Sequence, residues 1–343
     1  MKHALLPAAA AVALMAAATP ALAQDEVTFG TNWVAQAEHG GYYQAVATGI
    51  YEAFGLSVTI RPGGPQINHR QMLVSGNIDF LMGSNNSEGY NFVVEDLPFL
   101  SVAAIFQKDP QVWIAHESQG WATMEDLNNA SSILISADAR TSYWPFMVKL
   151  YGYPETLAGP YNFSAAPFLA DEGIVMQGYL TSEPYAVAEA GGDPQVFLLA
   201  DYGYDSYSTL ITTSQKLVDD NPDLVQRFVD ATVLGWYSYL YGDPTPGNDL
   251  IKADNPDMSD EQLAYSIEAM KVYGIVNSGD AETLGIGAMT DARWGDFFQA
   301  SVDVGQYEAD LDYTKAYTLE FVNDLDRLKA LAEEKGLDIP FGE

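Results

Sequence analysis

The order of apolar and polar positions predicts alternating strands and helices soon after the amino-terminal segment. The short runs 27–32, 56–61 and 78–82 have the length and β-branched content of strands. Between them, residues 42–54 repeat apolar side chains at the spacing of one helix face and stop at a glycine, and residues 66–75 predict a second helix. Such strand–helix–strand units have right-handed crossovers and parallel strands. Because ligands of open α/β sheets bind beyond the carboxyl ends of the strands, small-molecule binding is the first expectation.

A second α/β lobe is predicted between residues 93 and 207. Apolar strands are expected at 99–106, 112–116, 132–136 and 175–181. The residues after 116 contain Gly and Ser, as a segment that crosses between lobes would. From residue 214 onward the pattern is mostly helical and is expected to cover the first lobe.

The predicted fold is therefore α/β with two lobes, each a mainly parallel sheet flanked by helices, and a ligand cleft between them. The predicted segments are a signal peptide (1–23), the first part of lobe 1 (24–115), lobe 2 (116–203) and the return to lobe 1 (204–343), with the return crossing near 200–206.

The amino end predicts export. Lys2 and His3 precede an alanine-rich apolar stretch at 4–18, and residues 21–23 (Ala-Leu-Ala) fit a signal-peptidase site, so cleavage after Ala23 and a periplasmic location are expected. No other run of about twenty apolar residues occurs, so direct membrane insertion is not expected. The chain has no cysteine, which excludes a lipoprotein anchor, disulfides and thiol chemistry.

The net charge of the chain limits the classes of binding partner that are expected. The chain contains 15 Lys and Arg against 47 Asp and Glu, a formal net charge of −32, which disfavours nucleic acid and anionic lipid. The acidity fits either a salt-tolerant surface or a field that attracts a cationic ligand, and net charge does not separate the two. The acidic segments 219–223 and 254–257 lack the spacing of an EF-hand calcium loop and are better interpreted as helix starts.

Three segments together resemble a known family. They are Asn32–Trp33 with the following 38–43 (EHGGYY), residues 74–80 (VSGNIDF), and residues 178–185 (GYLTSEPY). Their order and spacing resemble periplasmic substrate-binding proteins of ABC importers, in the branch of thiamine-precursor (pyrimidine) binders and sulfonate, taurine and nitrate binders. The resemblance implies two hinged lobes that close on a small ligand and then dock on permease subunits. It implies no cofactor, and a monomer is expected.

From lobe 1, the resemblance places Trp33 at the cleft as a stacking platform for a planar ring, although a core Trp is the alternative. Glu38 and His39 are expected to bind a polar ring edge or to cap the next helix, and Tyr42 to line the cleft. Residues 84–86 (Ser-Asn-Asn) offer donors and acceptors at the end of the third strand, or cap the loop there.

From lobe 2, Arg140, Thr141 and Tyr143 match the ligand-contacting helix start of the family, and Glu183 with Tyr185 match its other wall. The alternative for this helix start is an ordinary N-cap. The alternative for Arg140 is an ion pair with acidic side chains at the surface. The candidate ligand-binding residues are Asn32, Trp33, Glu38, His39, Tyr42, Ser84, Asn85, Asn86, Arg140, Thr141, Tyr143, Trp144, Glu183, Tyr185 and Tyr207.

Carboxylates beside aromatic rings favour a neutral or weakly basic aromatic nitrogen heterocycle over an anion. A sulfonate, taurine or nitrate binder is the alternative. A pyrimidine-synthase-like enzyme is less favoured, because the synthases of this branch depend on a cysteine-rich iron motif. The histidines His39, His69 and His116 have no zinc-type spacing, and no catalytic residue or metal site is predicted.

Overall fold

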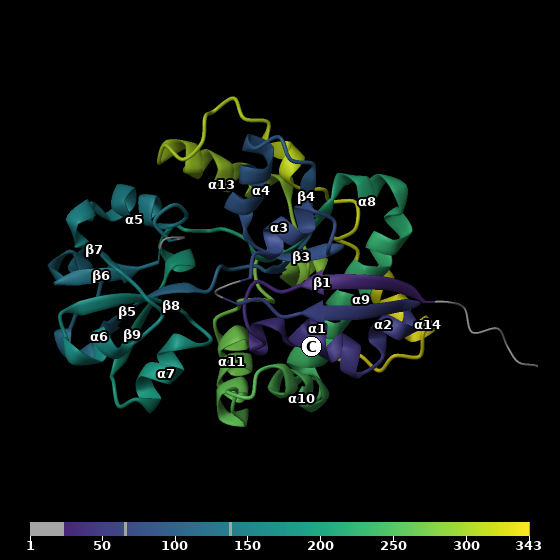
Figure 1. Cartoon of the computed structure of the whole chain (residues 1–343), viewed down its shortest axis with the longest axis horizontal. Helices are drawn as coiled ribbons and strands as arrows, with labels where there is room; N and C mark the ends of the chain where they lie inside the picture. The colour runs from purple at the N-terminus through teal and green to yellow at the C-terminus, as the bar shows by residue number, and fades with distance from the viewer. Residues whose placement is uncertain (1–23, 65–66, 137–138, 343) are drawn as a thin grey trace, which may run out of the picture.

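The computed structural model describes residues 24–64, 67–136 and 139–342, and its helices and strands form two α/β lobes (Figure 1). The predicted signal peptide lies outside the described residues.

Lobe 1 is built on a five-stranded mixed sheet in the order β2-β1-β3-β10-β4. The strands β1, β2 and β3 are parallel, whereas β10 is antiparallel to both of its neighbours. The strand bounds are β1 (Asp25–Gly30), β2 (Leu56–Arg61), β3 (Phe80–Asn85), β4 (Phe99–Phe106) and β10 (Ser208–Ser214). The surrounding helices are α1 (Gly40–Ala47), α2 (Ile50–Ala53), α3 (His69–Val74), α4 (Asn86–Val94), α8 (Gln215–Asp220), α9 (Pro222–Tyr241), α10 (Thr245–Asp254), α11 (Asp260–Val272), α12 (Ala281–Leu284), α13 (Asp291–Asp303) and α14 (Leu325–Glu334), with the short 3₁₀ segments η1 (Ala37–His39) and η6 (Tyr313–Ala316).

Lobe 2 repeats the plan with a second five-stranded mixed sheet in the order β7-β6-β8-β5-β9. Here β6, β7 and β8 are parallel and β5 is the antiparallel strand. Its elements are β5 (Gln111–His116), η2 (Glu117–Gln119), η3 (Glu125–Asn129), β6 (Ser132–Ile135), α5 (Trp144–Tyr151), η4 (Glu155–Leu157), β7 (Ala158–Pro160), α6 (Ala166–Ala170), β8 (Ile174–Tyr179), α7 (Glu183–Glu189), β9 (Pro194–Leu198) and η5 (Leu199–Tyr202). The predicted two-lobe α/β fold is confirmed.

The chain crosses between the lobes twice, at residues 107–110 and again between η5 and β10. The first crossing comes before the boundary expected at residue 115, because β5 pairs with β8 and β9 in the sheet of lobe 2. The expected helix 42–54 is also divided. Gly49 has a φ of 73°, in the left-handed region that glycine adopts readily, and it separates α1 from α2.

The core of lobe 1 lies where α9 packs on the sheet. Phe228 of α9 stacks on Phe80 with ring centroids 4.1 Å apart and on Tyr51 at 5.5 Å. All three rings are buried, so α9 is held to the sheet by aromatic packing.

Close packing of α1 on α9 fixes the start of α1. A Cβ on Gly235 would lie 2.3 Å from the Gly41 carbonyl oxygen, and a Cβ on Gly41 would lie 2.2 Å from the Trp236 ring. A Cβ on Gly40 would meet the Tyr239 ring at 1.9 Å. Any larger side chain at these positions would push the helices apart, so the glycines set where η1, directly before α1, is placed.

Replacing Phe228 by Ala is expected to lower the free energy of unfolding by about 3–5 kcal/mol, because it empties the centre of the lobe 1 core. Urea denaturation measures the change. The control is Val272→Ala at a side chain that is 67% exposed, where a change within about 0.5 kcal/mol is expected. Equal effects of the two substitutions would contradict the packing.

Candidate functional site

The two lobes meet where η1 and α11 of lobe 1 contact the end of β8, and we call this contact the seam. The Thr181 hydroxyl donates a hydrogen bond to Glu38 Oε1 across it. From α11, Ser266 Oγ donates to the Thr181 carbonyl oxygen at 2.6 Å, and the Tyr265 hydroxyl donates to the Leu180 carbonyl oxygen at 3.2 Å. Three side chains of lobe 1 therefore form hydrogen bonds to residues 180 and 181 of lobe 2.

Glu38 is the most unusual group at the seam. Its side chain is only 2% exposed, and its Oε2 atom has no hydrogen-bond partner among the described residues. Burial raises the pKa of Glu38 to about 7, the bond from Thr181 opposes that shift, and the nearby Glu183 carboxyl adds to it. The sequence expectation that Glu38 caps the next helix does not describe this contact, since its carboxyl group reaches across to lobe 2.

The His39 ring forms hydrogen bonds to the loop that precedes Glu38, and it remains uncharged. The Gln36 backbone N–H donates to His39 Nδ1 at 3.3 Å, and His39 Nε2 lies 3.2 Å from Asn32 Oδ1, which fits a ring that carries its proton on Nε2. Burial lowers the pKa of His39 to about 3. The ring therefore supplies no positive charge to its acidic neighbour at physiological pH.

Glu183 faces the seam from the start of α7 in lobe 2. It is half-buried, and its Oε2 accepts a hydrogen bond from the Tyr179 backbone N–H at 2.7 Å. Burial raises its pKa, and the backbone bond lowers it in part. Its carboxyl group raises the pKa of the Tyr161 hydroxyl together with burial.

Aromatic rings from the two lobes also meet. Trp33 is half-buried, and its ring centroid lies 5.5 Å from that of Phe163 in lobe 2, with 35° between the ring planes. Phe163 is 58% exposed and has a φ of 61°, which is an uncommon backbone conformation for a bulky residue. At a second point, Tyr185 lies 5.3 Å from Tyr265 of α11. The alternative interpretation of Trp33 as a core residue does not hold.

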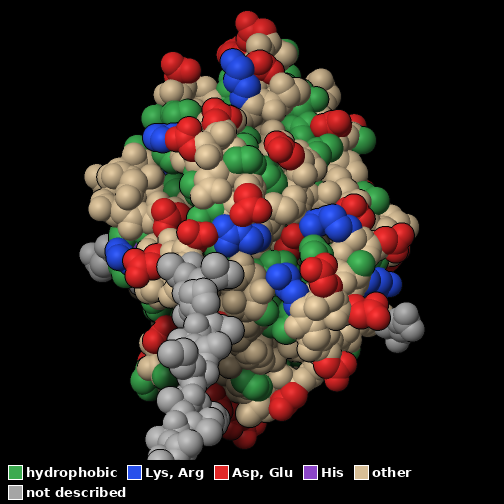
Figure 2. All heavy atoms as spheres, turned by 90° about the vertical axis from the view of Figure 1, so that its right-hand side faces the viewer, with side chains coloured by type: hydrophobic (Ala, Val, Ile, Leu, Met, Phe, Trp, Pro, Cys, Tyr) green, Lys and Arg blue, Asp and Glu red, His purple; other side chains and the backbone are tan. Residues whose placement is uncertain are grey.

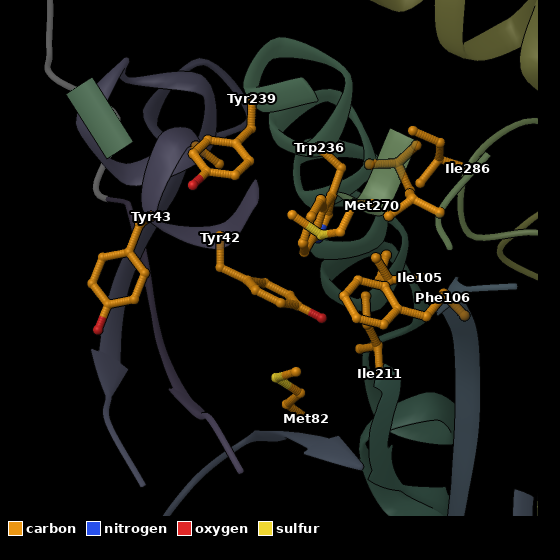
Figure 3. Close-up of a cluster of buried hydrophobic side chains, with 14 of the residues drawn as sticks. Tyr42, Tyr43, Met82, Ile105, Phe106, Ile211, Trp236, Tyr239, Met270 and Ile286 are labelled. Atoms are coloured by element: carbon orange, nitrogen blue, oxygen red, sulfur yellow. The ribbon is translucent and has the colours of Figure 1, made fainter. Parts of the chain in front are cut away.

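Three predicted cleft residues are core residues instead. Tyr42 is fully buried, with its ring 4.2 Å from Phe29, and its hydroxyl points toward Phe106 in the interior of lobe 1 (Figure 3). Trp144 is 2% exposed and donates through Nε1 to Glu155 at 3.1 Å. Tyr143 is also 2% exposed and packs on Trp113. The family resemblance predicted all three at the cleft, but their side chains turn toward the lobe interior.

Asn85 and Asn86 belong to the hinge. Asn85 Nδ2 donates to Asp109 in the first crossing at 3.3 Å and to the Tyr204 hydroxyl near the second at 3.2 Å, while its Oδ1 caps α4. The Asn86 backbone N–H donates to Ser206 Oγ at 3.2 Å. These amides tie the end of β3 to both crossings.

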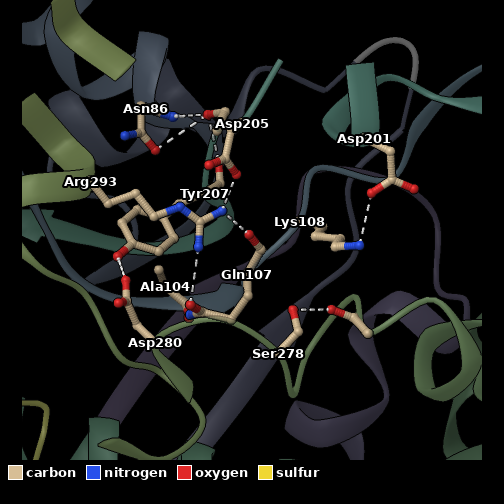
Figure 4. A network of polar contacts seen from close by, with 12 residues as sticks. Asn86, Ala104, Gln107, Lys108, Asp201, Asp205, Tyr207, Ser278, Asp280 and Arg293 are labelled. Carbon is tan, nitrogen blue, oxygen red and sulfur yellow. Dashed lines mark hydrogen bonds and ion pairs between the residues drawn. The ribbon is translucent and has the colours of Figure 1, made fainter. Parts of the chain in front are cut away.

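Tyr207 also lies at the hinge, in a polar network (Figure 4). Its hydroxyl donates to Asp280 and accepts from the Thr290 backbone N–H at 3.0 Å. The Arg293 guanidinium covers its ring at 4.3 Å, donates to the backbone and side chain of Gln107, and pairs with Asp205 at 2.6 Å. Arg293 thus links the two crossings directly.

The remaining candidates lie at the surface. Ser84 is exposed, and its backbone N–H donates to Glu88 at 2.7 Å. Arg140 is exposed and donates to the Ala158 carbonyl oxygen at 3.0 Å, and the carbonyl oxygen of the exposed Thr141 accepts from Gln306 at 3.2 Å. Among the described residues, Arg140 therefore bonds to a backbone carbonyl, and no acidic side chain there forms an ion pair with it.

The structure brings together the seam residues Asn32, Trp33, Glu38, His39, Glu183 and Tyr185. The sequence analysis missed their partners Tyr161, Phe163, Thr181, Tyr265 and Ser266. Thr181 lies inside the segment that carried the family resemblance, so its position was a usable signal. The other partners come from segments without a recognisable pattern. A surface hollow beside α9, lined in part by Val229 and Leu328, lies within lobe 1 away from the seam.

No helix in the described part of the chain combines the length and apolar character needed to cross a membrane. Within the same residues, no group of three or more His, Asp or Glu side chains is arranged to hold a metal ion.

Comparison with known proteins gives a consistent picture. A family model described as NMT1/THI5 like matches residues 36–246. The riboflavin-binding protein RibY of Chloroflexus aurantiacus is 25% identical over 326 residues, which cover 92% of this chain and 91% of that protein.

Solved structures share the fold at low sequence identity. The periplasmic aliphatic sulphonate binding protein SsuA of Escherichia coli superposes with a TM-score of 0.62 at 12% identity, covering 85% of this chain and 91% of that one. The desulfurization enzyme DSZB superposes with a TM-score of 0.58 at 14% identity, covering 91% of this chain and 99% of that one. These likenesses establish the periplasmic-binding-protein fold.

The raised pKa of Glu38 makes stability depend on pH. The folded pKa of about 7 exceeds the ordinary value of 4.5, so the contribution is full below about pH 4.5 and is lost as pH rises through about 7. Relative to Glu38→Gln, which does not titrate, the native protein is expected to lose about 3 kcal/mol over that range. Urea denaturation of both proteins at pH 4.5 and pH 8 measures this difference. A pH-independent difference would show that the Glu38 carboxyl group titrates normally.

Proposed function

The chain belongs to the NMT1/THI5-like family, and on that premise we propose that it is the solute-binding protein of an ABC importer. It captures a small aromatic nitrogen heterocycle between its two lobes and delivers it to permease subunits. In this proposal the segment 1–23 is a signal peptide that is removed after Ala23, and the mature protein acts in the periplasm as a monomer.

The observation that carries the proposal is the composition of the seam. Trp33 and Phe163 come from opposite lobes and face each other at 5.5 Å, and both keep part of their surface exposed. A flat ring that enters between the lobes would find aromatic faces from both sides. Beside them, Glu38 and Glu183 offer carboxyl groups to N–H groups on the edge of such a ring.

The charge at the seam supports a heterocycle over a sulfonate or nitrate. A bound anion would oppose the ionised forms of both Glu38 and Glu183, whose pKa values burial already raises. None of the ion pairs among the described residues supplies Lys or Arg to either carboxyl group. The sulphonate binder SsuA thus supports the fold of this chain but not an anionic cargo.

Two ligand types fall within the proposed class. A pyrimidine or thiamine precursor follows from the sequence resemblance. A flavin follows from the similarity to RibY, whose name describes riboflavin binding. Both are planar and carry ring nitrogen and N–H groups, so the same aromatic and carboxyl groups would serve either.

The mechanism follows from the hinge. Ligand joins one lobe while the lobes are apart, the crossings at 107–110 and 203–207 flex, and the other lobe adds its contacts. The ligand favours closure only as far as it binds the closed form more tightly than the open form.

An enzyme is the competing function, since the desulfurization enzyme DSZB shares the fold. One solved form of that enzyme is a Cys-to-Ser mutant in complex with biphenyl-2-sulfinic acid. This chain has no cysteine, so neither thiol chemistry nor a cysteine-rich iron motif is available to it. Conversion of a bound heterocycle during long incubation would favour the enzyme.

Isothermal titration of the mature protein with riboflavin, 4-amino-5-hydroxymethyl-2-methylpyrimidine, taurine and nitrate tests the proposal. Binding of a heterocycle, and no binding of taurine or nitrate, is expected. Binding of taurine or nitrate alone would overturn the ligand class.

Replacing Trp33 by Ala is expected to weaken binding of the heterocycle by about 1–3 kcal/mol, because a stacking face is lost. The matched control is Trp121→Ala, a half-buried tryptophan that follows β5 at the end opposite the first crossing. Its dissociation constant should match that of the native protein. If Trp33→Ala also leaves the constant unchanged, the indole does not contact the ligand.

A further inference from the structure

The seam places two acidic groups where the described side chains supply no positive charge. Glu38 is 2% exposed, its Oε2 atom is buried without a partner among the described residues, and Glu183 lies close enough to raise its pKa. Leaving a buried carboxyl oxygen unsatisfied is costly, so a group that completes its hydrogen bonding would be strongly favoured.

The described groups that face the Glu38 and Glu183 carboxyls supply no compensating positive charge. His39 is neutral, because its pKa is about 3. Tyr179 and Tyr239 approach Glu38, and Tyr161 approaches Glu183, but burial raises the pKa of each phenol and keeps it neutral. The Thr181 hydroxyl satisfies only Oε1 of Glu38. Every titratable neighbour is therefore either neutral or acidic.

We propose that the cargo itself brings the positive charge: the site takes a cationic nitrogen heterocycle, whose charged nitrogen lies against Glu38 Oε2 and Glu183 while its ring lies on Trp33. This inference rests on the proposed function and specifies the charge of the ligand. Glu38 is then the residue that determines specificity, since its Oε2 is a buried acceptor without a partner among the described residues.

Two further features agree with a cation. An indole face attracts a cation through its ring quadrupole, so Trp33 serves a charged ring better than a neutral one. The net charge of −32 also attracts cations toward the protein. On the face of lobe 1 shown in Figure 2, Asp and Glu side chains are spread widely among fewer Lys and Arg side chains.

Three probes with one ring test the charge directly: nicotinamide is neutral, 1-methylnicotinamide is a fixed cation and nicotinate is an anion. Competition against the heterocycle that binds most tightly, or direct titration, gives their dissociation constants at pH 7.5. The cation is expected to bind at least about tenfold more tightly than either other probe, a ratio equal to about 1.4 kcal/mol.

Glu38→Gln is expected to remove most of that preference, because the amide keeps the shape of the side chain without its charge. The matched control is Ser266→Ala, which removes a bond across the seam without touching either carboxyl group, and it should retain the preference for the cation. Because each ratio compares probes within one variant, a general change in lobe closure cancels.

The outcomes separate the two proposals. Equal binding of the neutral and cationic probes, or an unchanged preference in Glu38→Gln, overturns the inference and leaves heterocycle binding intact. Failure of all three probes and of the heterocycles in the wider titration overturns the proposed function as well.

Discussion

The close packing of α1 on α9 is the constraint on which the seam depends. Gly41 and Gly235 allow the two helices to approach until backbone meets backbone, and Trp236 and Tyr239 fill the space beside them. The segment before α1 then has one position, which directs Glu38 toward lobe 2. A sequence element that resembles a simple turn, Gly40–Gly41, therefore acts through packing, and the electrostatics of the seam follow from it.

The two lobes are joined by more than their chain crossings. Phe146 of α5 in lobe 2 stacks on Phe297 of α13 in lobe 1 at 5.3 Å, and Tyr204 meets the same ring edge-on. These rings belong to a buried cluster that contains residues of both lobes. Apolar packing holds the lobes on this side, whereas hydrogen bonds to Thr181 and its neighbour join them at the seam. The polar contact is the more easily exchanged for a ligand or water.

The sequence predicted the architecture well, because strand and helix periodicity reports directly on local structure. The family resemblance predicted Trp33, Glu38 and Glu183 at the cleft, and in the structure these residues lie where the lobes meet, while their role in ligand binding stays a prediction. The prediction was wrong for Tyr42, Tyr143 and Trp144, because a resemblance in sequence does not determine whether a side chain turns toward the cleft or the core. Phe163 was not found, since a contact between distant segments depends on tertiary packing that leaves no periodic signal.

The hinge network has a mechanical consequence. Arg293 bonds to Gln107 in one crossing and Asp205 in the other, and Lys108 of the first crossing pairs at 2.9 Å with Asp201 of η5, directly before the second (Figure 4). Sliding the two crossings past each other, or pulling them apart, would break these bonds. Rotation of one lobe against the other about the line of the crossings would not require them to break. Rotation about the crossings is therefore the relative motion of the lobes that these hinge contacts oppose least.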